Sequence, residues 1–546
     1  MNQPCDFHVP RTECSLTEFT PITEDELRRI IIKSPSKGCS LDPLPTRMVK
    51  KVINSLLPLM TKLINSSLES GTVPDSMKVA RISPLLKKPS LNCEELNSYR
   101  PVSNLSFLSK LLEKVVTKRL QAYMDLHGLY DPTQSTYRTG HSTETALTKV
   151  QNDLLCTIDK HGVAILVLLD LSAAFDTVDH DVLLDRMHSL LGIGGTVLKW
   201  FGSYLTGRRQ QVQIHDALSG MILLLFGVPQ GSVLGPILFL IYMLPLCHLI
   251  YTYGLQMHSY ADDTQIYLAF SNPKDANVVH QECTKVEQCL ADIHVWMTNN
   301  KLKLNNAKTE IMLFGTKSSL DKVDITSIEV AGTRVCIAEG PVRNIGVELD
   351  STLSMTSQVN RIVQSASFHL RNIGQVRTRL TETATKSLVQ SLVISRLDYG
   401  NSLLCGLPHE LMNKLQSVQN KAARMITLTK RREHITPVLK RLHWLPVDVR
   451  IDFKVLLLVY KALNGLAPQY IRDLLHKYQP TRQLRSSSCD MLQTPKSRTV
   501  RYGDRAFSVY APKIWNALPF QIKQSVSVSC FKSRLKTHFF KLKYSI

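Results

Sequence analysis

Three stretches of the chain have the pattern of β-strands. Residues 163–169 (VAILVLL) are continuously apolar, which is typical of a strand that is buried on both faces. Residues 257–270 (MHSYADDTQIYLAF) alternate apolar and polar side chains about an Ala-Asp-Asp centre, which predicts a β-hairpin. Residues 302–315 (LKLNNAKTEIMLFG) predict a loop followed by another strand.

Helical periodicity frames these strands on both sides. Thr23 and Glu26 have the spacing of a capping box before an amphipathic stretch, which predicts a short helix. Residues 39–71 predict a turn at 42–45 and then one or two helices that end at Gly71. Further helices are expected over residues 106–125, 357–376, 384–400 and 449–465. Strands framed by helices, followed by an all-helical part, predict an α+β fold with helical additions.

One apolar segment imitates a membrane span. Residues 217–261 contain no Asp, Glu, Lys or Arg. Pro245 and several other Pro and Gly residues interrupt the segment, and its clean apolar run, 237–244, is far shorter than the roughly 20 residues that cross a bilayer. We therefore expect a buried core element here and no membrane association.

Length and charge narrow the possibilities further. With about 150 residues to a domain, 546 residues predict three or four units, and 44% apolar residues exclude wholesale disorder. Residues 421–546 carry 25 Lys and Arg against 6 Asp and Glu, a net charge of +19, whereas the first 420 residues carry only +2. A strongly basic end beside a near-neutral body indicates a polyanion partner, most simply nucleic acid. A solvated basic surface is the alternative.

The cysteines favour a reducing compartment. The chain has 12 Cys and no C-x-x-C pair. Cys283, Cys289 and His294 come nearest to a metal cluster, but their spacing fits no zinc template, and positions on one helix explain them better. The first residues lack the apolar core of a signal peptide, so we expect an intracellular protein of the nucleus or cytoplasm that is not secreted.

Two acidic sites follow apolar strand residues. Asp170 comes directly after the run 163–169, and Asp262 and Asp263 stand at the centre of the predicted hairpin. Mg²⁺ prefers carboxylate oxygens, and two-metal phosphoryl transfer requires carboxylates that converge from separate elements. The three acids are therefore candidate ligands of two Mg²⁺ ions. Taken alone, they are equally explained as turn residues at strand ends.

Further motifs make the pattern specific. In chain order they are SYRPVS, QSTYRTGHST, LDLSAAFDTVDH, GVPQGS, YADD, NNAKTE and RNIGVELD. With this set the chain resembles the reverse transcriptase of LINE-type (non-LTR) retrotransposons, particularly the Jockey/chicken-repeat group. The resemblance begins near residue 39 and continues into the tail, for example in RLDYGNSLLCGLP. It implies a right-hand polymerase with fingers, palm and thumb.

The resemblance also implies roles for individual residues. Asp170, Asp262 and Asp263 match the catalytic carboxylates that hold two Mg²⁺ ions, for which Mn²⁺ is a possible substitute. Lys308 matches the lysine proposed to protonate the departing pyrophosphate. Gly346 lies where a turn that grips the primer is expected.

A second group of residues matches the nucleotide-binding positions of the family: Lys87, Arg100, Phe175, Gln230 and Gly231. The planar fork of Arg100 suits a triphosphate, and Lys87 or Lys88 would share that role. The ring of Phe175 would exclude a 2′-hydroxyl and so select deoxynucleotides, although ordinary packing is the alternative. Gly231 would permit close approach of the loop backbone.

The chain departs from the family in two respects. The family usually reads Q-S-G-F-R-P-G-H-S-T, whereas this chain has Thr136, Tyr137 and Thr139 at the departing positions. Thr136 replaces a glycine, which would be costly if the turn requires a positive φ. Nothing before residue 39 resembles the endonuclease of the family. We therefore expect the chain to extend a primer, with endonuclease activity supplied in trans.

Four regions are expected: an N-terminal helical extension, the fingers and palm, a helical thumb-like region and a basic C-terminal region, at residues 1–67, 68–345, 346–420 and 421–546. The expected function is RNA-directed DNA synthesis from a primer 3′-hydroxyl by two-metal phosphoryl transfer. An RNA template, a DNA primer or nicked target DNA, and deoxynucleoside triphosphates are the expected partners. The alternative is an inactive or host-retained relative that binds nucleic acid without turnover.

Overall fold

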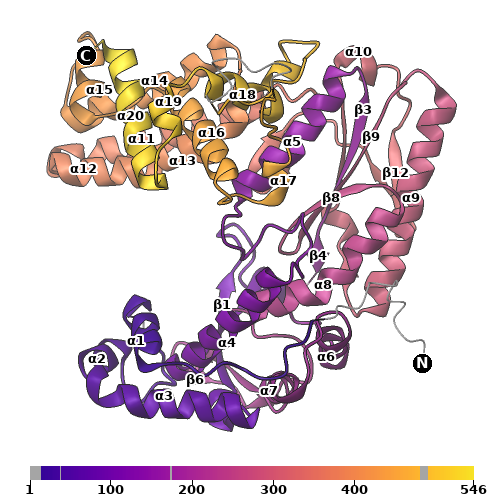
Figure 1. Cartoon of the computed structure of the whole chain (residues 1–546), viewed down its shortest axis with the longest axis vertical. Helices are drawn as coiled ribbons and strands as arrows, with labels where there is room; N and C mark the ends of the chain where they lie inside the picture. The colour runs from indigo at the N-terminus through magenta and orange to yellow at the C-terminus, as the bar shows by residue number, and fades with distance from the viewer. Residues whose placement is uncertain (1–13, 37, 173–174, 480–489, 546) are drawn as a thin grey trace. The chain divides into compact units, whose positions relative to one another are not determined.

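The computed structural model describes residues 14–36, 38–172, 175–479 and 490–545 (Figure 1). The chain forms two compact units, and each unit is assembled from three separate segments. The first unit consists of Met1–Asp131, Asp170–Gly254 and Cys289–Asn305, and the second of Pro132–Leu169, Leu255–Gln288 and Asn306–Ile546. The regions predicted from the sequence were continuous, and their functional boundaries stay predictions.

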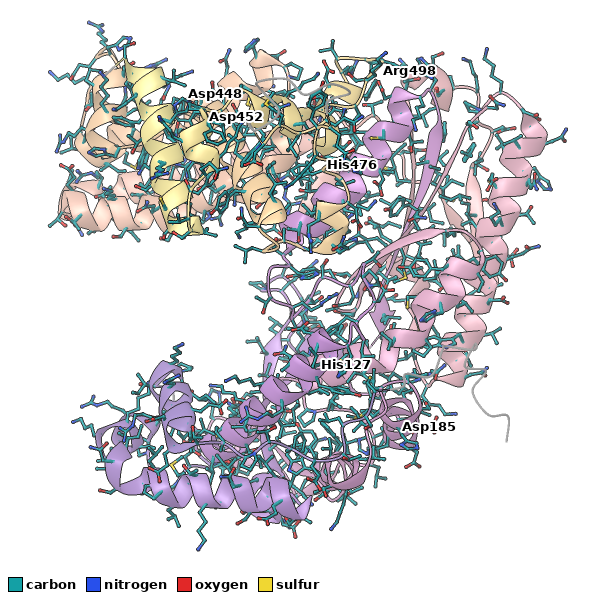
Figure 2. All side chains as sticks on the ribbon, viewed as in Figure 1. His127, Asp185, Asp448, Asp452, His476 and Arg498 are labelled. Atoms are coloured by element: carbon teal, nitrogen blue, oxygen red, sulfur yellow. The ribbon has the colours of Figure 1, made fainter. Side chains whose placement is uncertain are left out.

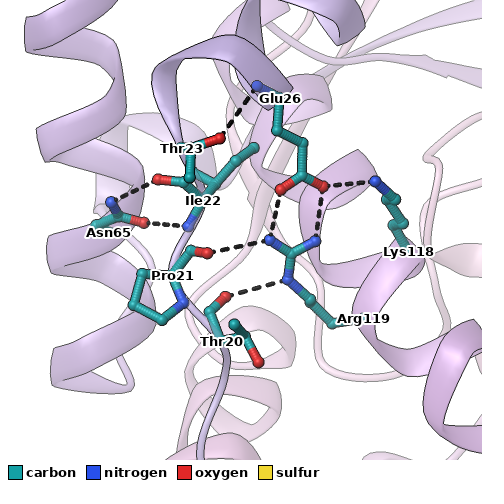
Figure 3. A network of polar contacts seen from close by, with 8 residues as sticks. All are labelled: Thr20, Pro21, Ile22, Thr23, Glu26, Asn65, Lys118 and Arg119. Atoms are coloured by element: carbon teal, nitrogen blue, oxygen red, sulfur yellow. Dashed lines mark hydrogen bonds and ion pairs between the residues drawn. The ribbon is translucent and has the colours of Figure 1, made fainter.

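The first unit begins with the helices that the sequence predicts. They are α1 (Glu24–Lys33), α2 (Thr46–Lys51), α3 (Ile53–Ser70) and α4 (Phe107–Leu126). The hydroxyl of Thr23 accepts a hydrogen bond from the backbone N–H of Glu26, as a helix N-cap should, and α3 ends at Gly71 with φ +66°. The Glu26 carboxylate does not complete the capping box. It binds Arg119 and Lys118 of α4 instead, and so ties α1 to α4 (Figure 3).

A five-stranded sheet forms the centre of the first unit. Its order is β2-β1-β5-β6, with β7 also paired to β5. Strand β1 (Val79–Leu86) runs antiparallel to β2 (Tyr99–Asn104) and parallel to β5 (Arg209–Ile214). The short strands are β6 (Ala217–Leu218) and β7 (Ile222–Leu223), and a separate pair joins β4 (Leu171–Ser172) to β10 (Lys303–Leu304).

The apolar segment forms α8 (Gly235–Thr252), next in chain order after α6 (His180–Ser189) and α7 (Gly195–Leu205). Helix α8 continues through Pro245, so the expectation that this proline interrupts the apolar run was wrong. By length and composition α8 would suffice to cross a membrane, but 67% of its apolar window is buried within the protein. The expectation of a buried core element is confirmed. Pro245 has no backbone N–H and therefore removes one hydrogen bond from α8. The packing of this buried helix compensates for that loss.

The second unit contains a four-stranded antiparallel sheet of order β11-β3-β9-β8. Its strands are β3 (Val163–Leu169), β8 (Gln256–Tyr260), β9 (Asp263–Phe270) and β11 (Glu310–Phe314). The predicted buried strand and hairpin are confirmed. Residues 264–268 of β9 are all buried rather than alternately exposed. Helix α5 (Thr143–Asp159) packs on this sheet, and α9 (Ala276–Asn299) follows β9 and contains Cys283, Cys289 and His294, as expected.

Smaller elements follow the sheet. Helix α10 (Lys317–Leu320) precedes two hairpins, the first formed by β12 (Ser327–Val330) and β13 (Thr333–Cys336). The second pairs β14 (Val342–Asn344) with β15 (Val347–Leu349). Its two-residue turn contains Gly346 at φ +84°. The predicted turn at Gly346 is therefore present, and its role toward a primer stays a prediction.

Helices make up the rest of the second unit. They are α11 (Thr356–Val376), α12 (Glu382–Val389), α13 (Ser395–Asp398), α14 (His409–Thr427), α15 (Thr436–Leu442), α16 (Val447–Leu463), α17 (Gln469–Arg472), α18 (Phe507–Asn516), α19 (Phe520–Lys523) and α20 (Val528–Tyr544). Asp448 and Asp452 lie one turn apart on α16 (Figure 2). Asp452 accepts a hydrogen bond of 2.6 Å from the Tyr510 hydroxyl of α18, and Asp448 binds Lys543 of α20 at 3.1 Å. These polar contacts tie α16 to both helices.

The basic C-terminal part is not a separate appendage. One hydrophobic cluster includes Leu155 of α5, Leu166 of β3, Ala422 of α14, Val455 of α16 and Phe531 of α20. Residues on both sides of position 420 therefore share a core. The α+β prediction is confirmed.

Candidate active site

The hairpin β8–β9 presents two of the candidate catalytic carboxylates. Tyr260 pairs with Asp263, so Ala261 and Asp262 form a two-residue turn. Ala261 has φ +62°, a left-handed conformation that glycine adopts most easily. Asp262 is half-buried and Asp263 is exposed. Backbone strain thus coincides with the acidic turn, as is common at functional sites.

Asp170 directly follows β3, the strand that pairs with β9. The pairing register places the end of β3 opposite the start of β9, next to this turn. Leu169, which precedes Asp170, is paired with Thr264, which follows Asp263. Asp170 accepts hydrogen bonds from Asn305, at 3.0 Å to its carboxylate and at 2.9 Å to its carbonyl. Within the described part of the chain, no group of three or more His, Cys, Asp or Glu side chains is arranged to hold a metal ion. The metal site stays a prediction.

The predicted triphosphate-binding residues lie on one hairpin of the first unit. Lys87 follows β1; its N–H donates to the carbonyl of Ser98 at 2.9 Å and its ammonium to the carbonyl of Asn97 at 2.8 Å. Arg100 lies on β2 opposite Leu85 and is exposed. An exposed Arg and a Lys at one end of this hairpin are compatible with an anionic ligand.

The GVPQGS loop is attached to the same hairpin. The N–H of Ser103 on β2 donates to the carbonyl of Gln230 at 2.7 Å. Gly231 has φ +109°, and a Cβ atom there would lie 2.8 Å from the carbonyl oxygen of Ser103. The loop therefore requires glycine at this position. Lys87 and Arg100 therefore lie toward one end of the β1–β2 pair, and the loop of Gln230 and Gly231 is attached to β2 at Ser103.

Glu113 holds the other side of this loop, and our sequence analysis missed it. This fully buried carboxylate of α4 accepts hydrogen bonds from the N–H of Val233 at 2.5 Å and from the hydroxyl of Tyr204 at 3.1 Å. Burial raises the pKa of Glu113, and the positive charge of Arg208 opposes that rise. The sequence signal that could have identified Glu113 is a single acidic residue next to Leu112, on the apolar face of an amphipathic helix.

Phe175 is half-buried, and its ring stacks on Phe239 of α8 with 5.0 Å between ring centroids. Its carbonyl accepts a hydrogen bond of 2.8 Å from the N–H of Val228, at the start of the GVPQGS loop. These contacts place Phe175 beside the loop. They fit ordinary packing as well as a contact with a nucleotide sugar, so its selective role stays a prediction.

Lys308 is exposed on a short 3₁₀ turn, Asn306–Lys308, in the second unit. This unit also contains Asp262 and Asp263, whereas Asp170 and the five nucleotide-binding candidates belong to the first. The proposed proton transfer from Lys308 stays a prediction.

The segment QSTYRTGHST runs beside the acidic hairpin. Ser135 donates its N–H to the carbonyl of Ser259 on β8 at 3.0 Å. The positive φ, +57°, falls on Tyr137 and not on Thr136, which is buried. The turn therefore does not require a positive φ at Thr136, and the cost that such a requirement would impose does not arise. Burial raises the pKa of the Tyr137 phenol, and the negative charge of Asp262 adds to that rise, so Tyr137 interacts with Asp262. The sequence marked Tyr137 as a departure from the family motif but gave no sign of this interaction.

Comparison with known proteins gives a consistent result. Residues 86–349 match the family described as "Reverse transcriptase (RNA-dependent DNA polymerase)". The chain is 27% identical over 417 residues to the "Probable RNA-directed DNA polymerase from transposon BS" of Drosophila melanogaster, which covers 74% of this chain and 45% of that protein. It is 24% identical over 418 residues to the "RNA-directed DNA polymerase from mobile element jockey" of the same species, covering 75% and 44%.

The chain spans just under half the length of these curated relatives. The match to the family nevertheless includes all nine candidate site residues, from Lys87 to Lys308. Residues 86–349 of this chain belong to the reverse transcriptase family.

Proposed function

We propose that the chain is an RNA-directed DNA polymerase that adds deoxynucleotides to a primer 3′-hydroxyl on an RNA template. The observation that carries the proposal is the family match over residues 86–349, a range that includes all nine candidate site residues. The names of the transposon relatives support the same activity. In this proposal residues 68–345 act as fingers and palm, and residues 346–420 act as a thumb.

The donor set fits divalent metal ions. Asp170, Asp262 and Asp263 offer only carboxylate oxygens, the ligand type that Mg²⁺ and Mn²⁺ prefer. Bound there, two ions would lower the pKa of the primer hydroxyl and stabilise the charge that develops on the leaving pyrophosphate. The backbone supports this role because Leu169 pairs with Thr264, next to the two acids of the turn.

The remaining residues position the substrate. Lys87 and Arg100 would bind the triphosphate, and the loop of Gln230 and Gly231 would position the nucleotide against the template. Phe175 would exclude a 2′-hydroxyl by its bulk, and Lys308 would give a proton to the departing pyrophosphate. Catalysis would then depend on orientation and charge neutralisation and not on a protein nucleophile.

The test is primer extension by the full chain on a defined RNA template with Mg²⁺ or Mn²⁺. We expect Asp262→Asn and Asp170→Asn to abolish extension while RNA binding is retained. Asp321→Asn is the matched control, because Asp321 is an exposed acid of the second unit outside the site. If the unmutated chain binds RNA but incorporates no nucleotide with either metal, the inactive nucleic-acid-binding alternative replaces this proposal.

A further inference from the structure

A cavity of about 570 Å³ opens among the helices of the second unit. It is bordered by α12 and the helical turn after it, by Asp398 of α13 and Asn401, by residues 442–445, by α16 and by α20. None of the candidate site residues lines it. It is therefore distinct from the polymerase site described above.

The wall of this cavity is strongly basic. Five of its lining side chains are Lys or Arg, and one, Asp398, is acidic. Asp398 forms an ion pair with Arg450, and Lys454 pairs with Glu144 at 3.0 Å. These two pairs leave three lining cations unneutralised.

The three cations are Lys386 of α12 and Lys532 and Lys536 of α20, and none of them has a carboxylate partner among the described residues. Lys532 and Lys536 are four residues apart on one helix, so their ammonium groups share a face. Both are exposed, whereas Lys386 is half-buried. Three unpaired cations around one concavity attract a group with several negative oxygens.

The positive charge at this wall affects a neighbouring lysine, Lys461. The pKa of Lys461, on α16, is lowered first by burial and then by the charges of Lys532 and Lys454. Lys461 therefore adds to the positive charge near Lys532, although it does not line the cavity. An anionic ligand would offset this positive charge.

The wall also offers a hydrogen-bond acceptor. Asn401 is only 2% exposed, it lines the cavity, and its side-chain oxygen is buried without a partner among the described residues. An unsatisfied buried acceptor costs about 1–3 kcal/mol, so a donor from a ligand is favourable here. The cavity thus combines cations for phosphate with an acceptor for a hydroxyl or N–H group.

We propose that this cavity binds the sugar-phosphate backbone of an RNA strand, outside the polymerase site. Phosphates would lie against Lys386, Lys532 and Lys536, and Asn401 would accept a hydrogen bond from a ribose 2′-hydroxyl. The choice of RNA as ligand rests on the proposed function, in which an RNA template is the partner. The site would keep hold of the template away from the position of nucleotide addition.

The first experiment measures the affinity of the full chain for a single-stranded RNA oligonucleotide as a function of salt. We expect Lys532→Gln with Lys536→Gln to weaken binding and to lower the slope of log affinity against log salt by about 1.4, the value for two lost phosphate contacts. Lys496→Gln with Lys541→Gln is the matched control, because both lysines are exposed, belong to the same basic region and lie outside the cavity. Equal slopes for the two double variants would overturn the proposal.

The second experiment compares RNA with DNA of the same sequence. The unmutated chain should bind RNA more tightly, and Asn401→Leu should reduce that preference while the thermal unfolding midpoint checks that the variant is folded. Equal affinity of the unmutated chain for RNA and DNA would overturn the assignment to RNA.

Primer extension separates this proposal from the proposed function. The Lys532 and Lys536 double variant should raise the KM for the RNA template and leave kcat unchanged, whereas Asp262→Asn should abolish kcat. Loss of RNA affinity in the double variant of a chain that never extends a primer would contradict the polymerase and leave the RNA site standing. A fall in kcat without a change in template KM would contradict the RNA site.

Discussion

The hydroxyl of Tyr470 lies 2.7 Å from the hydroxyl of Ser135, 335 residues earlier in the chain. The same oxygen of Ser135 lies 2.8 Å from Nε2 of His258, and the Tyr470 hydroxyl also contacts Thr145 at 2.9 Å. Tyr470, Ser135 and His258 are all buried. His258 lies on β8, four residues before Asp262, so this chain of hydrogen bonds connects α17 in the basic C-terminal part to the strand that leads into the acidic turn.

Replacing Tyr470 with Phe tests this connection. The variant leaves the hydroxyls of Ser135 and Thr145 with fewer partners in a buried place, at a cost of about 1–3 kcal/mol of unfolding free energy. If the contact positions the hairpin, primer extension should fall more than RNA binding does. Denaturant unfolding, template binding and extension are measured together. Tyr478→Phe is the control, since Tyr478 is exposed; equal behaviour of the two variants would show that the contact does not matter.

The stability of the second unit should depend on pH through His258. Burial, with the nearby charges of Lys149 and His141, lowers the pKa of His258 from 6.5 to about 3. In acid the unfolded state takes up a proton near pH 6.5 that the folded state does not accept until about pH 3. The contribution to stability is therefore complete above pH 6.5 and is lost progressively as the pH falls toward 3.

Unfolding by denaturant at a series of pH values between 3 and 8 measures this effect. His258→Gln should remove this part of the acid sensitivity, whereas His280→Gln, at an exposed position of α9, should keep it. Identical pH profiles of the two variants would contradict a neutral buried His258.

The elements that the sequence predicts well are those with strong periodicity. Strand β3 and the β8–β9 hairpin could be predicted because continuous or alternating apolar residues end at turns. Burial of β9 on both faces could not be predicted from the sequence, because it depends on distant segments. These are α5 and Asn344, whose side chain donates a hydrogen bond to Gln265 at 2.7 Å. Contacts between distant segments leave no local signal. The division into two units of three segments each has the same origin.

The site was predicted through its motifs, and the positions that support it were not. Gly231 was expected to allow a close backbone approach, and it does so against Ser103. A cost at Thr136 was expected only if its turn required a positive φ, and the positive φ falls on Tyr137 instead. The backbone conformation of this chain therefore does not require a glycine at position 136.

Glu113 should be required for the GVPQGS loop to keep its position. Glu113→Gln removes the charge that faces the buried Arg208 and weakens the acceptor for the N–H of Val233. An unsatisfied buried polar group costs about 1–3 kcal/mol, and more when the group is charged, so we expect at least that loss in unfolding free energy. Because the loop carries Gln230, the KM for deoxynucleotides should rise as well.

Denaturant unfolding and steady-state extension measure these two effects. Glu69→Gln is the matched control, because Glu69 is an exposed acid of the same unit. A Glu113→Gln variant with the stability and the nucleotide KM of this control would show that the loop does not depend on the carboxylate.

Glu26 should make the first unit sensitive to acid at a lower pH than His258 affects the second. Its carboxylate accepts hydrogen bonds from Arg119 at 2.8 and 2.9 Å and from Lys118 at 2.6 Å (Figure 3). The hydrogen bonds from Arg119, with those from Lys118 and the charges of both residues, lower the pKa of Glu26 to about 2 against burial, which raises it. Since the folded pKa lies below the ordinary value of 4.5, stability is complete above pH 4.5 and is lost as the pH falls toward 2.

Glu26→Gln should therefore reduce stability at neutral pH and flatten its dependence between pH 4.5 and 2. Hydrogen bonds to a charged group contribute about 1.5–3 kcal/mol, and partial exposure of this site favours the lower end of that range. Glu24→Gln, at an exposed acid in the same first turn of α1, loses a similar favourable interaction with the helix dipole without removing the Arg119 contact, and it therefore serves as the control. If both variants lose stability equally and show the same pH profile, the attachment of α1 to α4 does not depend on the Glu26–Arg119 contact.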